Sequence, residues 1–230
     1  MTESGARGWQ AWVFRRRLDQ WLYRIWRLNP RALYRRVQQR RFDRTHDVET
    51  SGYGDLRYEP TPAAVFDELM KRAAVDFETT SFIDIGSGKA KVLLLAANYP
   101  FRRIIGVEKY EDLFRVGEEN LRRATASPTR CADIRTHCLD ACDFEFPEEP
   151  SVLYFFNPFP IEVLRKVLAN LEASLRRNPR AVTVLFYAPI LKRHTPWDRR
   201  GIFDDSPMLE IETETRAFTI YRAREKATHR

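Results

Sequence analysis

From residue 80 onward, the hydrophobic positions alternate between short continuous runs and runs with helical spacing. Five strand-like runs, most of them apolar, predict β-strands: SFIDI, RRIIGVE, IRTHCLD, SVLYFFN and AVTVLFY. Between them, apolar residues three or four positions apart predict helices at about 89–98, 111–125 and 161–176. Strands that alternate with helices and are apolar on both faces are typical of a parallel sheet with helices on both sides.

The pattern changes near the C-terminus. The runs MLEIETE and AFTIYRAR are separated only by Thr215 and Arg216, so they predict an antiparallel hairpin. We therefore expect an α/β fold with a Rossmann-like sheet that is mostly parallel, ends in an antiparallel hairpin and carries helices on both faces.

Residues 1–50 have a different character. Apolar residues at helical spacing predict an amphipathic helix within 12–29, and Asn29 and Pro30 predict the start of a second helix. Residues 1–45 contain 12 arginines and three acids, a local balance of +9, whereas the whole chain has a net charge of +7. We expect a basic helical extension at 1–50 and a separate domain at 51–230, in which Thr61 caps a helix that starts at Pro62.

The composition limits the class of protein. A length of 230 residues with 43% hydrophobic and 31% charged residues suits one globular domain with an appendage. No apolar run approaches the roughly 18 residues of a membrane-spanning helix, and the N-terminus lacks the apolar core of a secretory signal. Cys131, Cys138 and Cys142 form neither an even disulfide set nor a zinc pair, so we expect free thiols, a cytoplasmic location and no metal.

The segment FIDIGSGKAK, residues 82–91, predicts a glycine-rich turn between a strand and a helix. A phosphate-binding P-loop requires Ser or Thr after Gly-Lys, and Ala90 occupies that position. A nicotinamide or flavin fingerprint requires a third glycine where this chain has Lys91, which weakens a dehydrogenase interpretation without excluding it.

The D-x-G-x-G pattern from Asp84 to Gly88 resembles class I S-adenosylmethionine (SAM) methyltransferases, and the resemblance extends from about residue 50 to the C-terminus. Many members of that class have a further glycine where this chain has Ala90. The resemblance implies SAM as the cofactor, with Asp84 near its cationic groups. It also implies that Glu108 binds the ribose hydroxyls and that Asp140 lies near the adenine amino group.

The same resemblance implies a set of cofactor-binding residues at the turn, at the strand ends and in the segment YEPTP. They are Tyr58, Thr61, Asp84, Gly86, Ser87, Gly88, Glu108, Asp140, Ala141 and Asn157. In open α/β sheets, ligands bind beyond the carboxyl ends of the strands, which is where these residues are expected to meet.

The segment NPFP suggests the methyl acceptor. It resembles the signature of methyltransferases that act on planar nitrogens, but the match is imperfect, because Phe159 stands where a second proline is expected. Together with GVEK at 106–109, the pair Asn157 and Phe159 is more similar to non-SET histone-lysine methyltransferases. The segment YEPTP is similar to one in small enzymes that methylate a lysine of a membrane-bound ATP synthase subunit. These resemblances imply that Asn157 and Phe159 are catalytic and that the acceptor is an amine nitrogen, with Glu59 near its ammonium.

Several alternatives stay open. The chain could methylate a small molecule or RNA, or it could be a non-catalytic module that keeps a SAM or nucleoside site. The basic extension could be a lid over the acceptor site, a helix on an anionic membrane or an RNA-binding segment.

Overall fold

The computed structural model describes residues 30–50, 59–124, 129–156, 160–188, 201–215 and 217–224. The chain divides into two compact units, Met1–Thr45 and His46–Arg230. The described part of the first unit forms helix α2 (Pro30–His46), which begins at the proline that the sequence indicated. The helix predicted within 12–29 lies outside the described residues.

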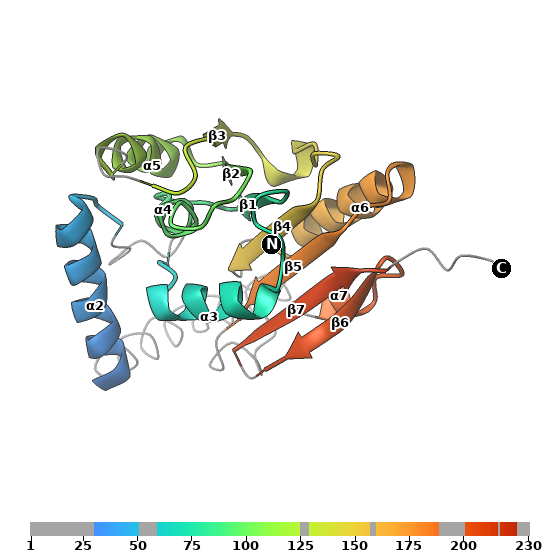
Figure 1. Ribbon diagram of the computed structural model, residues 1–230, viewed down its shortest axis with the longest axis horizontal. Coiled ribbons are helices and arrows are strands. Elements are labelled where there is room, and N and C mark those ends of the chain that lie inside the picture. Colours follow the sequence, from blue (N-terminus) through green and yellow to red (C-terminus); the bar gives the residue numbers. More distant parts are fainter. Residues whose placement is uncertain are drawn as a thin grey trace, which may run out of the picture. The chain divides into compact units, whose positions relative to one another are not determined.

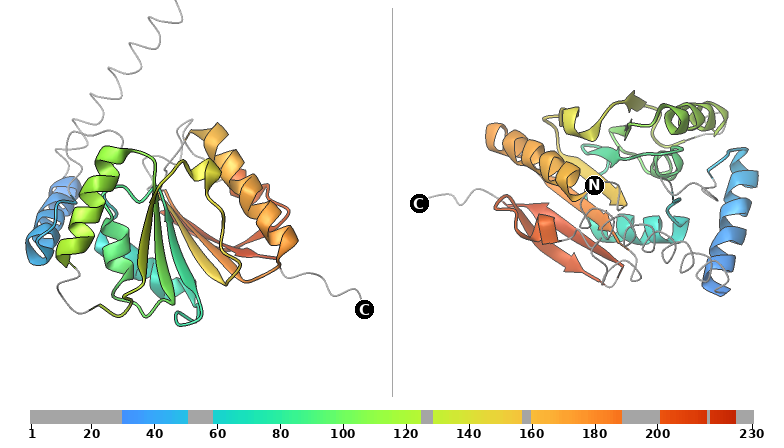
Figure 2. Two further views of the ribbon diagram at one scale, coloured as in Figure 1. Left: turned by 90° about the horizontal axis from the view of Figure 1, so that it is seen from above. Right: turned by 180° about the vertical axis from the view of Figure 1, so that it is seen from behind.

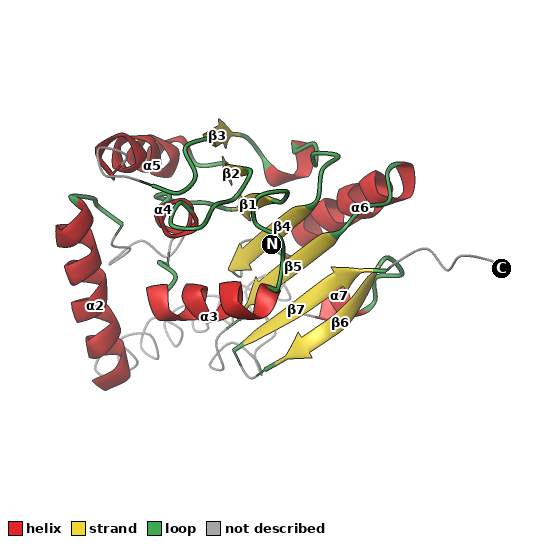
Figure 3. Cartoon of the chain, in the orientation of Figure 1, coloured by secondary structure: helices red, strands yellow, loops and turns green. Residues whose placement is uncertain are grey.

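The second unit is built on one seven-stranded sheet, and its strands follow the order β3-β2-β1-β4-β5-β7-β6. The strands are β1 (Ser81–Ile85), β2 (Arg103–Glu108), β3 (Ile134–Cys138), β4 (Ser151–Phe156), β5 (Val182–Tyr187), β6 (Leu209–Glu214) and β7 (Phe218–Ala223). The first five pair in parallel, whereas β7 runs antiparallel to both β5 and β6 (Figures 1 and 3). The predicted fold class, including the C-terminal hairpin, is confirmed.

Helices cover both faces of the sheet (Figure 2). One face carries α3 (Ala63–Ala73), α4 (Lys91–Ala96) and α5 (Glu111–Ala124). The other carries the short helix η1 (Ala141–Asp143), α6 (Ile161–Arg177) and α7 (Gly201–Asp204). The alternation of side chains along each strand decides which residues meet which layer.

Each face has its own apolar core. On the α3 side, the Phe66 ring meets the edge of Phe82 at a centroid distance of 5.6 Å. On the α6 side, Leu164 and Leu171 pack in one buried cluster with Leu153 and Phe155. Because both faces are covered, β1, β4 and β5 are buried along almost their whole length, which explains their continuous apolar sequences.

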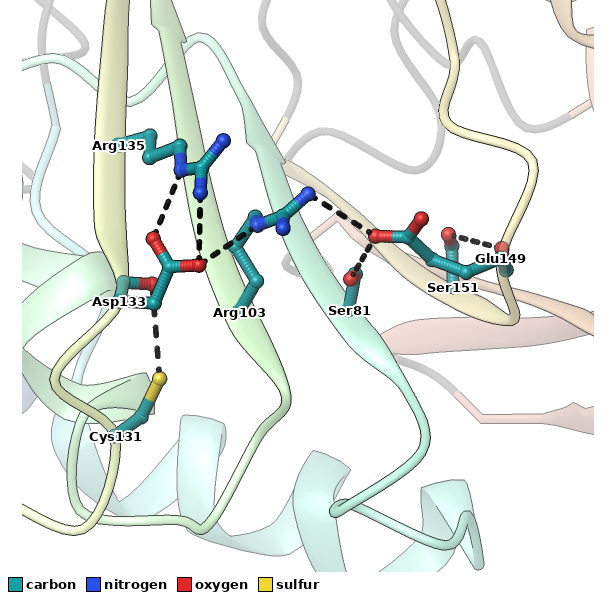
Figure 4. A network of polar contacts seen from close by, with 7 residues as sticks. All are labelled: Ser81, Arg103, Cys131, Asp133, Arg135, Glu149 and Ser151. Atoms are coloured by element: carbon teal, nitrogen blue, oxygen red, sulfur yellow. Dashed lines mark hydrogen bonds and ion pairs between the residues drawn. The ribbon is translucent and has the colours of Figure 1, made fainter.

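A polar network ties together the amino ends of four strands (Figure 4). The Arg103 guanidinium donates to Asp133 at 2.9 Å and contacts Glu149 at 3.4 Å. Ser81 donates to the same Glu149 oxygen at 2.7 Å, and Arg135 makes a second ion pair with Asp133. Arginine and carboxylate therefore cross-link this end of the sheet, and the carboxyl ends of the strands lie at the opposite edge.

Two sequence expectations were wrong in detail. Helix α3 begins at Ala63 after Pro62, which makes no side-chain capping hydrogen bond, so Thr61 is not the cap. Helix α4 spans only Lys91–Ala96, which is shorter than the predicted 89–98. The four-residue helix α7 was not predicted, because Gly201–Asp204 is too short to show a helical period.

Candidate functional site

The glycine-rich turn follows β1 and precedes α4, at the centre of the parallel part of the sheet. Gly86 and Gly88 have φ of 93° and 53°, a left-handed backbone that glycine adopts without steric cost. The Gly86 and Ser87 amides donate to the Val107 carbonyl at 2.8 and 2.9 Å. The turn is thereby fixed to the end of β2. Ala90 also has a positive φ, 63°, which for a residue with a Cβ is strained.

Two glycines outside the turn let it pack closely. A Cβ on Gly117 of α5 would lie 3.1 Å from the Gly88 carbonyl oxygen and 3.3 Å from the Ala90 Cβ. A Cβ on Gly106 of β2 would lie 3.1 Å from Ser87 Oγ. Sequence reasoning did not identify Gly117. It could have been found because a glycine inside a helical pattern usually indicates a position where the helix packs closely against another segment.

Glu108 ends β2 and braces the turn from the side. Its carboxylate is buried and accepts hydrogen bonds from the Gly88 and Tyr110 amides, each at 2.8 Å. Each carboxylate oxygen keeps a second lone pair that a ligand hydroxyl can use. Glu108 therefore lies where the sequence indicated, and it also orders the turn itself.

Asp84 lies on β1 beneath the turn and is only 3% exposed. Within the described part of the chain, no hydrogen-bond donor contacts its carboxyl group. Burial, and then the negative charge of Glu108, raise the pKa of Asp84 well above its ordinary value. A buried carboxyl in this state gains most from a cation, because an opposite charge favours its ionised form.

The residues before α3 are anchored beside Asp84. The Thr61 hydroxyl and the Tyr154 hydroxyl share a buried hydrogen bond of 2.7 Å. Tyr154 is the register neighbour of Asp84 on the adjacent strand β4, so both side chains point to the same face. Burial raises the pKa of Tyr154 well above its ordinary value. Thr61 is thus placed at the predicted site, although its role as a helix cap is replaced by this contact.

Asp140 lies at the end of β3 and is already engaged on both oxygens. One oxygen accepts from the Cys142 amide at 3.0 Å, which caps η1, and the other pairs with Lys109 at 2.6 Å. The hydrogen bond from Lys109, and then that from the Cys142 backbone, lower the pKa of Asp140 to about 2. Ala141, the next predicted residue, is buried beside it. The Lys109 contact was not foreseen.

A short segment after α2 is fastened over the turn. The Asn120 side chain accepts from the Glu49 amide at 2.7 Å and donates to the Glu49 and Lys89 carbonyls at 3.0 Å. The Lys89 ammonium pairs with the Glu49 carboxylate at 2.9 Å. Asn120 is 1% exposed, and it is a positioning residue that the sequence reasoning missed.

The remaining predicted residues cannot be placed. Tyr58, Asn157 and Phe159 lie outside the described residues. Next to them, the Phe156 and Tyr187 rings meet at a centroid distance of 4.6 Å at the ends of β4 and β5. Among the described residues, no cluster of His, Cys, Asp and Glu could hold a metal ion. No described helix is long and apolar enough to cross a membrane.

A separate cavity lies on the other face of the sheet. It has a volume of about 350 Å³ and is lined by Ile105 of β2, by Arg135 and His137 of β3, and by Phe144. Ile105 and its register partner Arg135 point to the face opposite to that of Gly106 and Glu108. The cavity therefore opens on the side away from the glycine turn. It is not part of the site formed by the strand ends.

Together, these contacts place three carboxylates at three adjacent strands, Asp84 on β1, Glu108 on β2 and Asp140 after β3. Asp140 is paired with Lys109, and the buried carboxyl groups of Asp84 and Glu108 beside a turn of backbone amides form a pair that favours a cationic ligand. This pair disfavours a diphosphate, which would meet like charges.

The comparisons with known proteins agree with this architecture. No protein-family profile and no curated protein matches the chain in sequence. A putative methyltransferase of Escherichia coli is 14% identical, with a TM-score of 0.53 over 76% of this chain and 91% of that protein. Magnesium protoporphyrin IX methyltransferase of Synechocystis PCC 6803, solved with bound SAM, is 15% identical, with a TM-score of 0.51 over 85% and 96%. A SAM-dependent methyltransferase of Aquifex aeolicus is 11% identical, with a TM-score of 0.51 over 69% and 88%.

The chain therefore has the fold of class I SAM-dependent methyltransferases, with the antiparallel strand β7 inserted between β5 and β6. Likeness at these identities establishes the fold alone. The chemistry of this chain rests on the residues of its own site.

Proposed function

We propose that this protein is a SAM-dependent methyltransferase that transfers a methyl group to an amine nitrogen, of a protein lysine or a similar amine. The observation that carries the proposal is the Glu108 carboxylate, which is hydrogen-bonded to the Gly88 amide and lies beside the buried Asp84, a carboxyl group that meets no hydrogen-bond donor among the described residues. The proposed catalytic domain comprises residues 51–230, with residues 1–50 as a basic extension, in the cytoplasm.

The residues present fit SAM. Its ammonium and sulfonium groups are cationic, which suits the buried carboxyl group of Asp84. Its vicinal ribose hydroxyls suit the free lone pairs of Glu108, and its adenine suits Asp140 and the buried Ala141. The backbone of Gly86, Ser87 and Gly88 allows close approach without a phosphate. SAM supplies the methyl group, activated by the positive sulfur.

In the proposed reaction, the lone pair of a neutral amine attacks the methyl carbon in line as the carbon–sulfur bond breaks. The products are S-adenosylhomocysteine and a methylated ammonium, which releases its proton to solvent. The chain contributes by orientation and by excluding water. We assign the orientation of the amine to the Asn157 carbonyl, because it follows β4 directly, and contact with the acceptor to Phe159.

The charge and aromatic character of this region support an amine acceptor. Phe156 and Tyr187 form an aromatic pair where β4 and β5 end, and aromatic faces attract cations. Glu59 lies two positions before Thr61, whose hydroxyl is hydrogen-bonded to Tyr154 of β4, so an acidic residue lies close to this strand. An acceptor that arrives as an ammonium is attracted here, whereas a nucleic acid phosphate is repelled.

Calorimetry with SAM, S-adenosylhomocysteine and NADH tests the cofactor assignment. We expect heat with the first two ligands and none with NADH; uptake of NADH alone contradicts the proposal. We further expect Asn157→Ala to leave SAM binding almost unchanged and to abolish turnover. Equal loss of both would remove its catalytic role.

The acceptor class is tested by incubating the enzyme with methyl-labelled SAM and a cell extract. Label in protein that survives nuclease treatment and maps to lysine supports the proposal. Label confined to RNA or to small molecules overturns the amine-of-protein assignment and leaves the cofactor assignment intact. SAM binding without label in any fraction would identify a non-catalytic SAM-binding module instead.

A further inference from the structure

One exposed stripe of helix α2 has two chemically distinct halves. Leu33, Val37, Arg40 and Arg44 are separated by four, three and four positions, so they lie along a single line on the helix. Leu33 and Val37 are 58% and 56% exposed, and both arginines are exposed as well. The stripe is therefore apolar toward the start of the helix and basic toward its end.

The flanking positions repeat this division. Tyr34, beside Leu33, is 65% exposed, and Arg41, one residue beyond Arg40, is also exposed. The only acidic residue of α2 is Asp43, which accepts a hydrogen bond from Gln39 at 3.0 Å. The face therefore combines three adjacent exposed apolar side chains with three arginines and no acid.

We propose that this face of α2 docks the protein on an anionic phospholipid surface. The arginines bind lipid phosphates, and the apolar half enters the boundary between headgroups and acyl chains. Arginine suits the first task because its guanidinium binds phosphate oxygens through two parallel hydrogen bonds. Aromatic and aliphatic side chains suit the second, because the membrane interface accepts an apolar body with a polar tip such as tyrosine.

The aliphatic residues favour lipid over nucleic acid. Arginine and tyrosine could bind either, since arginine pairs with any phosphate and tyrosine stacks on bases. Leu33 and Val37 offer a nucleic acid neither stacking nor hydrogen bonds, whereas a lipid surface removes them from water. The sequence before α2 adds Trp9, Trp12, Trp21 and Trp26, a residue type that is enriched at membrane interfaces.

The proposal is tested by vesicle flotation with the full-length protein. Vesicles of phosphatidylcholine alone are compared with vesicles that contain about one quarter phosphatidylglycerol, at low and high salt. We expect binding to the anionic vesicles only, weakened by salt. The variant R40Q/R41Q should bind the anionic vesicles at least about tenfold more weakly, because each basic residue near an anionic surface contributes to binding.

The apolar half and the control are tested in the same assay. L33S/V37S should also reduce binding several-fold. The matched control R165Q/K166Q removes two adjacent exposed basic residues from α6 and should bind like the original protein. Calorimetry with SAM on each variant reports whether the second unit remains intact, independently of the lipid result.

Two outcomes of the flotation assay overturn the proposal. One is the absence of binding to anionic vesicles. The other is binding that L33S/V37S leaves unchanged and that a single-stranded RNA oligonucleotide displaces, which would show a general polyanion site. Hydrogen exchange of the unaltered protein gives a check that needs no variant. Amides at about 33–41 should gain protection with anionic vesicles, and unchanged exchange also contradicts the proposal.

Discussion

The Glu108 carboxylate accepts a hydrogen bond from the Gly88 amide at 2.8 Å, so the end of β2 holds the turn that follows β1. Hydrogen bonds to a charged group contribute about 1.5–3 kcal/mol each. We expect Glu108→Ala to weaken SAM binding about ten- to a hundredfold. Glu108→Gln keeps one acceptor oxygen and should therefore lose less SAM affinity than Glu108→Ala. Calorimetry measures both, with the exposed Glu162→Gln as control, and equal affinity in all variants would remove Glu108 from the site.

Because Gly117 lies close to the turn, we expect Gly117→Ala to destabilise the protein, although helix propensity alone would predict that it stabilises the protein. Glycine to alanine inside a helix usually stabilises by about 1 kcal/mol. Here the new Cβ would lie 3.1 Å from the Gly88 carbonyl oxygen, and such overpacking costs about 1–3 kcal/mol. We expect Gly117→Ala to lower Tm and to weaken SAM binding, whereas Arg115→Ala on the exposed side of α5 should not weaken it.

Ala90→Gly should partly rescue Gly117→Ala. It removes the Cβ that would lie 3.3 Å from the new one, and it relieves the positive φ of 63° at that residue. A double-mutant cycle by chemical unfolding measures the coupling between the two sites. Additive effects would mean that these positions do not touch.

Asp84 makes both stability and SAM affinity depend on pH. The unfolded chain ionises this carboxyl group at its ordinary pKa, whereas burial and Glu108 raise the pKa in the folded protein. The ligand-free protein should therefore lose stability as pH rises from the ordinary value through the raised one. Cation binding favours the ionised form, so SAM affinity should rise with pH over the same interval.

The neutral variant Asp84→Asn should abolish both pH trends and weaken SAM binding about tenfold or more, through the lost charge. Urea unfolding and calorimetry across pH measure the two effects. Asp205→Asn, an exposed carboxyl group on the other side of the sheet, is the matched control. Parallel pH profiles for the original protein and Asp84→Asn would contradict the assignment.

The Thr61–Tyr154 hydrogen bond should be visible as a coupling energy. Thr61→Val or Tyr154→Phe alone leaves one buried hydroxyl without its partner, at a cost of about 1–3 kcal/mol. The double variant removes both hydroxyls and should cost less than the sum of the two single changes. Denaturant unfolding of the four proteins measures this, and strict additivity would show that the pair is not coupled.

Much of the second unit could be predicted from sequence because local pattern and global fold agree there. The apolar runs gave β1, β2, β4 and β5, because strands buried on both faces must be apolar along their length. The positions of Asp84 and Glu108 followed from the same pattern, because the ends of parallel strands meet at one edge.

What the sequence could not supply are contacts between distant residues. Thr61 precedes a proline-initiated helix, which favours a cap, but the buried Tyr154 hydroxyl, 93 residues later in the chain, binds it instead. Gly117 and Asn120 look unfavourable within a helix, and their roles depend on the turn and on the segment at Glu49. Lys109 was likewise noticed only as part of a motif, because its partner Asp140 comes from another strand end.

The positive charge of α2 comes from arginine alone, and its sequence contains no lysine. Guanidinium groups stay protonated at any physiological pH and are not substrates for lysine acetylation. Lysine acetylation can therefore not adjust the charge of this helix. Its electrostatic attraction is tuned by ionic strength and by the charge of the opposing surface, whereas arginine methylation would keep the charge and block the paired hydrogen bonds to phosphate.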